Sequence, residues 1–195
     1  MIDLATHKFT TPIKCIKTPM VIGAWLRGKT HREYKAFIEK LADSIKSKNN
    51  DYRKTLPKSP TTDALLSLLS QLNTWVDETE NEPQEKGNAR FGNPAFRTWY
   101  ELLSKNAVSL CETVLSAGTR FEVEGLEGVM DADILKNAAE EISVYLLDSF
   151  GNSIRIDYGS GHEMAFIVFL YCLFRIGVLD AGSEADLVHT GGVLE

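Results

Sequence analysis

Apolar residues recur at three- and four-residue steps in much of the chain, which is the spacing of one face of an α-helix. The spacing predicts four amphipathic helices, which begin near Thr30, after Ser59-Pro60, after Asn93-Pro94 and near Ile134. The apolar stripes of these four helices are, in order, Tyr34, Phe37, Ile38, Leu41 and Ile45; Leu65, Leu68, Leu69, Leu72 and Val76; Phe96, Trp99, Tyr100 and Leu103; and Ile134, Leu135, Ala138, Ile142, Tyr145 and Leu146.

A fifth helix is predicted from about Gly161 to about Ile176, and apolar residues occupy nearly every one of its faces. A helix of this kind must be surrounded by protein. Alternation of apolar and polar residues, the pattern of a half-buried strand, is nowhere convincing. The sequence therefore predicts an all-α fold, a helical bundle around a central apolar helix.

The ends of the helices are predicted from capping residues. Thr62 or Asp63 can cap the second helix and Asn93 the third, because their side chains can accept a hydrogen bond from a free backbone N–H. Gly151 suits the C-terminal cap of the fourth helix. Residues 46–58, which are polar and end in prolines, are predicted to form a loop.

The two ends of the chain lack the helical spacing. Residues 1–29 carry Pro12 and Pro19 among β-branched residues and are predicted to form an extended N-terminal arm. Residues 182–195 contain Gly191-Gly192 and are predicted to form a loose tail. One helical domain is expected between them, over residues 30–181.

Composition narrows the class of protein. The formal net charge is −6 without long runs of like charge, which argues against a nucleic-acid partner. Three widely spaced cysteines suggest neither a zinc site nor a disulfide framework. The longest uncharged apolar run, Met164–Phe174, is too short to span a bilayer, and the N-terminus lacks the pattern of a signal peptide. We expect a soluble protein of the cytoplasm or nucleus, with no membrane partner.

The candidate chemistry lies between the fourth and fifth helices. Ser160 and Glu163 have the spacing of a capping box, and Gly159 and Gly161 on either side of the cap allow close approach of a ligand. The N–H groups of such a helix start favour an anion. A helix start with a good cap explains this local pattern equally well. The density of polar groups beside the most apolar helix suggests a functional site in addition to a helix cap. The polar residues that fall within nine positions are Arg155, Asp157, Tyr158, His162 and Glu163.

Two other chemistries at this segment are less favoured. A zinc protease site needs a second histidine one turn after His162, and that position is Phe166, so His162 is expected to donate a structural hydrogen bond and no metal site is predicted. A nucleophilic pair of Ser160 and His162 is disfavoured because such close sequence neighbours rarely point at one another.

A second polar cluster opens the third helix, at Arg90-Phe91-Gly92-Asn93-Pro94-Ala95-Phe96-Arg97-Thr98-Trp99-Tyr100. Arg90 and Arg97 could donate hydrogen bonds to a carboxylate or a phosphate. A salt bridge from Arg97 to Asp157 is an equally simple structural explanation for the second arginine.

The two clusters, in this order, resemble the phosphotyrosyl phosphatase activator family, the all-helical activators of protein phosphatase 2A. The most specific string is Asp157-Tyr158-Gly159-Ser160-Gly161-His162-Glu163, preceded by Gly151-Asn152 and Arg155-Ile156, and the similarity extends from Phe9 to about Leu179. The resemblance implies binding to the phosphatase catalytic subunit, peptidyl-prolyl cis/trans isomerase activity on proline-containing peptides, and dependence on ATP and magnesium.

The resemblance also assigns candidate site residues. Isomerisation needs desolvation and a hydrogen-bond donor near the proline nitrogen rather than a nucleophile, and a groove lined by Asp157, Tyr158 and His162 is compatible with it. The residues expected to bind a ligand or the partner are Arg90, Asn93, Arg97, Arg155, Gly159, Ser160, Gly161 and Glu163.

The family continues beyond its apolar helix with further helices, including a Pro-Ala-Gly-Ser…Gly-Val-Trp-Gly-Leu-Asp-Asp block, and this sequence does not contain them. The fold is therefore expected to be incomplete relative to the family's. Two functions follow as alternatives: a phosphatase activator with isomerase activity and ATP/Mg dependence, or an interaction module that binds the phosphatase without nucleotide chemistry. The uncovered flank of the apolar helix predicts self-association.

Overall fold

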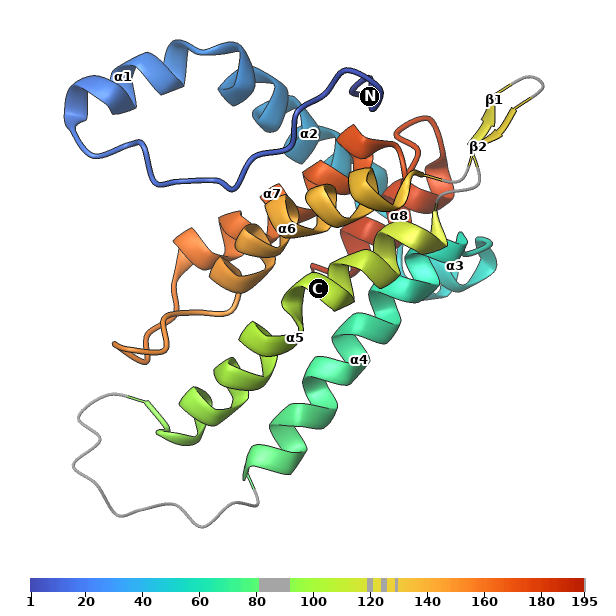
Figure 1. The fold of residues 1–195 in the computed structure, drawn as a ribbon. Coiled ribbons are helices and arrows are strands. Elements are labelled where there is room, and N and C mark those ends of the chain that lie inside the picture. The colour runs from blue at the N-terminus through green and yellow to red at the C-terminus, as the bar shows by residue number, and fades with distance from the viewer. Residues whose placement is uncertain (81–91, 119–120, 124–125, 129, 195) are drawn as a thin grey trace.

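The computed structural model describes residues 1–80, 92–118, 121–123, 126–128 and 130–194. Within these residues the chain is a helical bundle with one short hairpin (Figure 1). The helices are α1 (Pro19–Arg27), α2 (Lys29–Ile45), α3 (Asn50–Thr55), α4 (Pro60–Glu80), α5 (Ala95–Ala117), α6 (Ala132–Asp148), α7 (Ser160–Ile176) and α8 (Glu184–Gly192); the strands are β1 (Phe121–Val123) and β2 (Leu126–Gly128).

The core follows the order of the chain. Helix α4 packs on α5, α5 on α6 and α6 on α7, while α2 and α8 pack on one another and α2 also contacts α7. On α5 the buried residues Trp99, Leu103, Ala107 and Cys111 fall at four-residue steps, as an amphipathic helix requires. The centre of α7 is fully enclosed at Phe169, Leu170 and Leu173. The predicted all-α bundle around an apolar helix is confirmed.

The predicted N-terminal arm is wrong over residues 19–27, which form α1. Proline is typical of extended segments, but Pro19 occupies the first helical position, where its missing N–H has no partner to lose. The predicted loop at 46–58 is wrong over α3, whose first turn is capped by the Asn49 side chain accepting from the Tyr52 N–H at 2.9 Å.

The predicted loose tail is also wrong, because residues 184–192 form α8, with Leu187 and Val188 buried. The Ser183 hydroxyl caps this helix by accepting from the Asp186 N–H at 3.2 Å. A β-carbon on Gly191 would overlap the Ile45 side chain, so the pair of glycines that suggested a tail instead permits close packing on α2. Helix α8 therefore completes the bundle on the side of α2.

The polar contacts of α8 hold it to α3. The Lys48 ammonium lies 2.6 Å from the Glu184 carboxylate, and the Tyr52 hydroxyl donates to the same carboxylate at 2.8 Å. The Arg53 guanidinium donates to the Gly192 carbonyl at 2.6 Å. The short helix α3 thus fixes both ends of α8.

The short hairpin and the cap of α4 also differ from what the sequence predicts. Strands β1 and β2 pair in antiparallel register, with Glu122 opposite Glu127, and they are too short for an alternating pattern to stand out. At the start of α4 the cap is Ser59 rather than Thr62 or Asp63, since the Ser59 hydroxyl accepts from the Thr62 N–H at 3.2 Å.

Candidate functional site

The two polar clusters of the sequence meet where α5 begins and the segment between α6 and α7 crosses it. The Arg97 Nε donates to the Ser153 carbonyl at 3.1 Å, and its Nη2 donates to the Ile154 carbonyl at 3.4 Å. Gly92 approaches Ile156 so closely that a β-carbon on the glycine would overlap the isoleucine side chain. The predicted Arg97–Asp157 salt bridge is wrong: Arg97 holds backbone carbonyls instead, and the two clusters form one surface.

The segment from 151 to 158 is a tight, internally bonded loop. The Asn152 N–H donates to the Asp157 carbonyl at 3.0 Å, and the Asn152 side-chain oxygen accepts from the N–H groups of Ile154 and Arg155 at 3.0 and 2.9 Å. Gly151 has φ +110° and stands against the Asp157 carbonyl, so no other residue fits there without strain. Ile156 has φ +51°, an outlier for a β-branched residue of the kind that gathers at functional sites.

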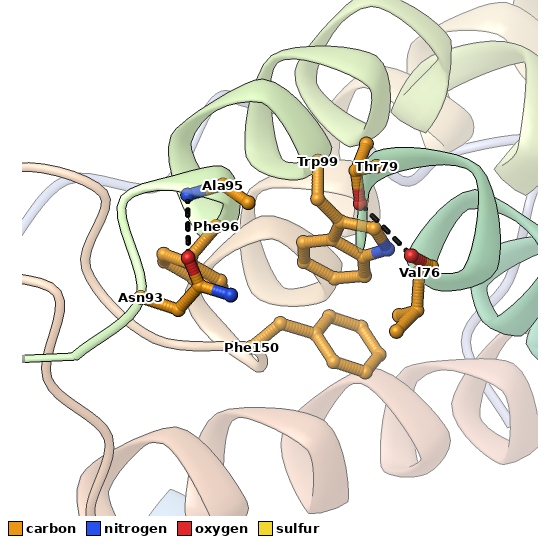
Figure 2. A pocket seen from close by; sticks show the side chains of 7 residues that line it. All are labelled: Val76, Thr79, Asn93, Ala95, Phe96, Trp99 and Phe150. Carbon is orange, nitrogen blue, oxygen red and sulfur yellow. Dashed lines mark hydrogen bonds between the residues drawn. The ribbon is translucent and has the colours of Figure 1, made fainter. Parts of the chain in front are cut away.

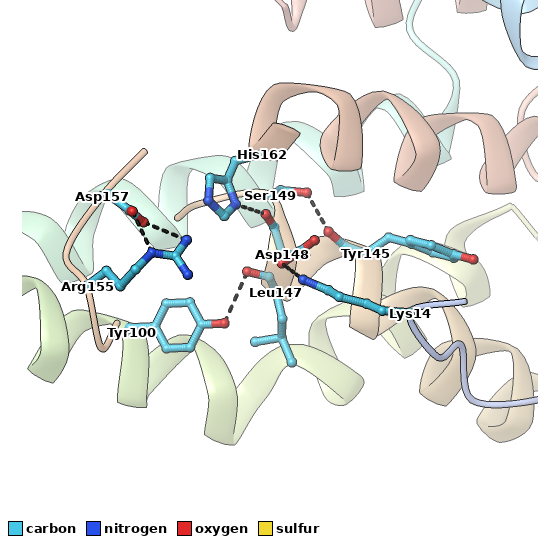
Figure 3. Close-up of polar contacts among 9 residues, drawn as sticks. All are labelled: Lys14, Tyr100, Tyr145, Leu147, Asp148, Ser149, Arg155, Asp157 and His162. Atoms are coloured by element: carbon cyan, nitrogen blue, oxygen red, sulfur yellow. Dashed lines mark hydrogen bonds and ion pairs between the residues drawn. The ribbon is translucent and has the colours of Figure 1, made fainter. Parts of the chain in front are cut away.

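The Asp157 carboxylate forms a salt bridge with Arg155 within this loop. The Arg155 guanidinium donates to both carboxylate oxygens of Asp157, at 2.6 and 3.1 Å (Figure 3). The hydrogen bond from Arg155 lowers the pKa of the Asp157 carboxyl, so this group is a carboxylate at neutral pH. Both side chains stay solvent-accessible, so they form an exposed, largely neutralised pair rather than a buried acid or base.

His162 connects α7 to the end of α6. Its Nδ1 lies 2.5 Å from the Asp148 carbonyl oxygen, one of the last carbonyls of α6 (Figure 3). Because a carbonyl only accepts, Nδ1 carries the proton, and in the neutral ring Nε2 is then an acceptor. The expectation that His162 donates a structural hydrogen bond is confirmed.

Tyr158 is the most exposed member of the predicted catalytic set, with 61% of its surface accessible. Its ring stacks on the His162 ring, with centroids 5.7 Å apart and planes 23° from parallel. Partial burial and the nearby Glu163 raise the pKa of the Tyr158 phenol. Tyr158 therefore keeps its proton at neutral pH and is a hydrogen-bond donor.

The start of α7 differs from the predicted capping box. Gly159 is the N-cap, its φ of −172° is extended, and no side chain accepts a cap hydrogen bond. The N–H groups of His162 and Glu163 point to the Gly159 carbonyl, at 2.8 and 3.4 Å. The predicted box is wrong because the helix starts one residue earlier than that box requires, which makes Ser160 the first helical residue.

The same helix start is open to solvent. A β-carbon placed on Gly159 or Gly161 would meet nothing within 4 Å. An open helix start suits an anion, but Glu163 in the first turn adds negative charge at the same place. The geometry accommodates a phosphate group sterically, and the local charge opposes it.

Two pockets lie on either side of Phe150. The first, of about 360 Å³, is mostly apolar and lies between the end of α4 and the start of α5 (Figure 2). The polar groups around it are occupied internally: the Asn93 side-chain oxygen accepts from the Ala95 N–H at 3.0 Å, and the Trp99 indole donates to the Leu72 carbonyl at 2.9 Å. It is lined by Val76, Thr79, Asn93, Ala95, Phe96, Trp99 and Phe150.

The second pocket, of about 430 Å³, adjoins the predicted catalytic residues. Tyr158 and Glu163 form part of its wall, together with apolar residues of α7 and of the segment after α8. The sequence pattern did not identify Phe150, Val193 or Leu194 as site residues, because it carries no signal for which segments meet. The lining residues are Ser149, Phe150, Tyr158, Glu163, Phe166, Ile167, Val193 and Leu194.

Arg90, one of the predicted ligand-binding residues, lies outside the described residues. Within the described part of the chain, no group of three or more His, Cys, Asp or Glu side chains is arranged to hold a metal ion. Every buried side-chain nitrogen or oxygen that the structure describes has a hydrogen-bond partner. The polar groups that remain available to a ligand are therefore the exposed ones at the loop and at the start of α7.

An all-helical bundle whose α5 and α7 starts share one polar surface does not by itself define a function, because one fold serves many activities. Comparison with known proteins is more specific. The chain belongs to the family described as phosphotyrosyl phosphate activator (PTPA) protein, whose sequence model matches residues 12–191. The family resemblance seen in the sequence is confirmed.

Several relatives are similar over most of this chain. A probable serine/threonine-protein phosphatase 2A activator 1 of Dictyostelium discoideum is 34% identical over 95% of this chain and 51% of its own length. The corresponding activator 1 of Mycosarcoma maydis is 35% identical over 94% of this chain and 34% of its own. The serine/threonine-protein phosphatase 2A activator 2 of Saccharomyces cerevisiae is 30% identical over 89% of this chain and 44% of its own length. The chain thus spans about half the length of these relatives, or less.

A solved structure agrees with the fold. The crystal structure of the PP2A phosphatase activator Ypa1 PTPA1 superposes with a TM-score of 0.68 and 22% identity, covering 95% of this chain and 54% of that one. At this identity the likeness concerns the fold alone.

Proposed function

We propose that this chain binds the catalytic subunit of a serine/threonine phosphatase of the 2A type and promotes its activity. The observation that carries the proposal is the convergence of the two family strings: Arg97 and Gly92 contact the loop that leads into Asp157–Glu163. Both strings therefore contribute to one exposed surface in a chain whose relatives are named phosphatase 2A activators.

Peptidyl-prolyl isomerase activity is the finer part of this proposal. Twisting an X–Pro bond is aided by a desolvated environment and by a donor to the imide nitrogen. Tyr158 is the best donor of the predicted catalytic set, because Asp157 is a paired carboxylate and the free nitrogen of neutral His162 accepts. In this scheme His162 orients the phenol through ring stacking, and the pocket beside Tyr158 takes the proline ring.

ATP and magnesium dependence belongs to the same proposal. The residues that would hold a nucleotide phosphate are Gly159, Ser160 and Gly161, through the N–H groups at the open start of α7. The nucleotide with its magnesium would supply a polyanion between this chain and the phosphatase. Arg155 could contribute positive charge only by leaving its pairing with Asp157.

Binding to the phosphatase is tested by pull-down of the purified catalytic subunit. Asp157→Ala frees Arg155 and removes the exposed ion pair, and we expect at least a tenfold loss of recovered phosphatase. Asp51→Ala on α3 is the matched control, since Asp51 is also an exposed aspartate paired with a nearby basic residue, Lys54. Equal recovery with both variants would remove this surface from the partner interface.

The isomerase part is tested by the rate of cis/trans exchange in a proline peptide. Tyr158→Phe keeps the ring stacked and removes only the donor, so we expect at least a tenfold fall in the catalysed rate at unchanged phosphatase binding. Tyr52→Phe, which also removes an exposed phenol, should leave the rate unchanged. A Tyr158→Phe variant as fast as the unaltered protein would exclude Tyr158 as the donor.

The alternative function is an interaction module that binds the phosphatase without nucleotide chemistry. It is favoured by the negative charge of Glu163 in the first turn of α7 and by the commitment of Arg155 to Asp157. Calorimetry with ATP and magnesium separates the two functions. Saturable binding in the micromolar range, strengthened by Glu163→Gln, would reject the module without nucleotide chemistry. The absence of any heat of binding would support that module.

A further inference from the structure

Positive charge is concentrated at one end of the chain. Residues 4–32, called here the basic segment, contain six Lys and Arg and no Asp or Glu, whereas the whole chain has a formal net charge of −6. The remaining residues therefore carry −12. The charge is therefore distributed unevenly along the sequence.

The first part of the basic segment lies on the acidic body. The Thr10 N–H donates to the Glu141 carboxylate of α6 at 2.6 Å, and the Lys14 ammonium lies 3.4 Å from Asp148. The Ile2 N–H donates to the Arg175 carbonyl near the end of α7 at 2.8 Å. These contacts hold the segment that leads to α1 against α6 and α7. They therefore fix the position at which α1 begins.

Helix α1 stands at the periphery of the bundle, where it packs on α2 (Figure 1). None of its nine residues, all of them described, is buried. Arg27 is its one polar side chain, and the apolar side chains are open to solvent: Met20 is 84% exposed, Leu26 50% and Ile22 45%. Ile22, Trp25 and Leu26, at three- and four-residue steps, share one face of this helix, and an exposed apolar face marks an interaction site.

The basic residues flank this apolar helix. Lys17 precedes it, Arg27 ends it and Lys29 follows it, and all three are exposed. A short helix with apolar residues including a tryptophan, edged by lysine and arginine, has the composition of helices that lie in the interface of an anionic membrane.

We propose that α1 and the basic residues around it bind the surface of an anionic phospholipid bilayer, with Ile22, Trp25 and Leu26 in the acyl boundary. Within the described residues, no helix is long and apolar enough to cross a bilayer. The expectation from the sequence that the protein has no membrane partner rests on the length of its apolar runs. That length does not address binding at the membrane surface.

A second copy of the chain fits this surface less well. A symmetric contact between two α1 helices would place Lys17, Arg27 and Lys29 of one copy close to the same residues of the other, which is repulsive. The five exposed apolar side chains of α1 are also few beside the roughly 20–30 residues that each partner contributes to a stable interface. A bilayer needs neither symmetry nor a matching pocket.

The test is flotation of the full chain with phosphatidylcholine vesicles, with and without phosphatidylserine, at low and high salt. We expect binding only to the vesicles that contain phosphatidylserine, with release at high salt. Since each basic residue near an anionic surface contributes about a fivefold factor in affinity, Lys17→Glu with Lys29→Glu should weaken binding by about 25-fold or more. Ile22→Asp with Leu26→Asp should abolish it.

Matched controls lie elsewhere on the surface. Ile154→Asp changes an isoleucine that is 82% exposed, and Lys40→Glu with Lys105→Glu reverses two exposed lysines outside the basic segment. Both control proteins should float like the unaltered one, and circular dichroism should show the same helix content in all. Absence of flotation, equal binding to neutral vesicles, or equal loss in the controls would each overturn the proposal.

A lipid-free measurement separates the protein alternative. If sedimentation velocity shows a concentration-dependent dimer that Ile22→Asp with Leu26→Asp removes, while flotation is absent, the surface binds a second copy and the lipid proposal fails. These outcomes are independent of phosphatase binding, which the Asp157→Ala variant measures at another part of the molecule.

Discussion

Helices α1 and α8 have the same length, nine residues each, and opposite relations to the core. Helix α1 is almost wholly apolar, yet none of its residues is buried. Helix α8 contains two glycines and several polar residues, yet six of its nine residues are buried, including Asp186 and His189. Apolar content alone therefore does not decide which segment joins the core. Close approach and satisfied polar groups decide it here.

The difference has a visible cause at α8. Gly191 allows the helix to contact Ile45, the Ser183 and Asp186 side chains satisfy backbone N–H groups at its start, and His189 lies 3.2 Å from the Leu56 carbonyl. Helix α1 has no side-chain cap at its start, and its Gly23 approaches only the Arg27 side chain. Burial of α8 rests on these specific contacts.

A pair of valines gives the largest expected contrast. Val188 in α8 is 1% exposed and Val21 in α1 is 37% exposed. Val188→Asp would bury an unpaired charge, and we expect a loss of about 4 kcal/mol in the free energy of unfolding. Val21→Asp should change it by no more than about 0.5 kcal/mol. Urea unfolding followed by circular dichroism measures both, and similar losses would show that α1 is part of the folded core.

A pair of glycines sharpens the same contrast with opposite signs. Gly191→Ala would push the new methyl group into the stiff side chain of Ile45, and we expect a destabilisation of about 1–3 kcal/mol. Gly23→Ala adds a methyl group that meets only the flexible Arg27 side chain, at ordinary contact distance, and we expect a stabilisation of up to about 1 kcal/mol. Thermal melts of the two variants should shift in opposite directions; a shift in one direction for both contradicts the packing described for α8.

The smallest effect concerns pH. Hydrogen bonds from Lys48 and Tyr52 lower the pKa of the Glu184 carboxyl below its ordinary value of 4.5. Because the folded-state pKa is depressed, the stabilisation is present above the unfolded-state pKa and is lost as pH falls through the folded-state pKa. The unaltered protein should therefore lose stability on acidification below about pH 4.5 more steeply than Glu184→Gln, in unfolding measured across that range. Identical acid profiles would mean that this contact does not contribute.

The long helices could be predicted from the sequence because each has a stripe that repeats over several turns. The start of α2 and the burial of Leu65 and Leu103 follow from spacing alone. The errors concern short elements: α1, α3, α8 and the hairpin are each too short for periodicity to register. What placed α8 was its fit against Ile45 and Arg53, and no local pattern encodes such a contact.

Candidate site residues can be chosen from the sequence, but the geometry that brings them together cannot be predicted from it. The family strings identified Arg97, Asp157, Tyr158 and His162 as candidates. The sequence predicts the contacts of these side chains wrongly or not at all. Arg97 binds carbonyls of the loop rather than Asp157. Asp157 is held by a residue two positions away, a local pairing that only the loop conformation permits.

The contact between His162 and the Asp148 carbonyl has a consequence for the ligand groups that the site can select. Because Nδ1 donates its proton to that carbonyl, the neutral ring offers a ligand only the acceptor at Nε2. This nitrogen therefore selects an N–H or O–H group rather than a carbonyl, and the end of α6 sets that preference by holding the ring in one tautomer.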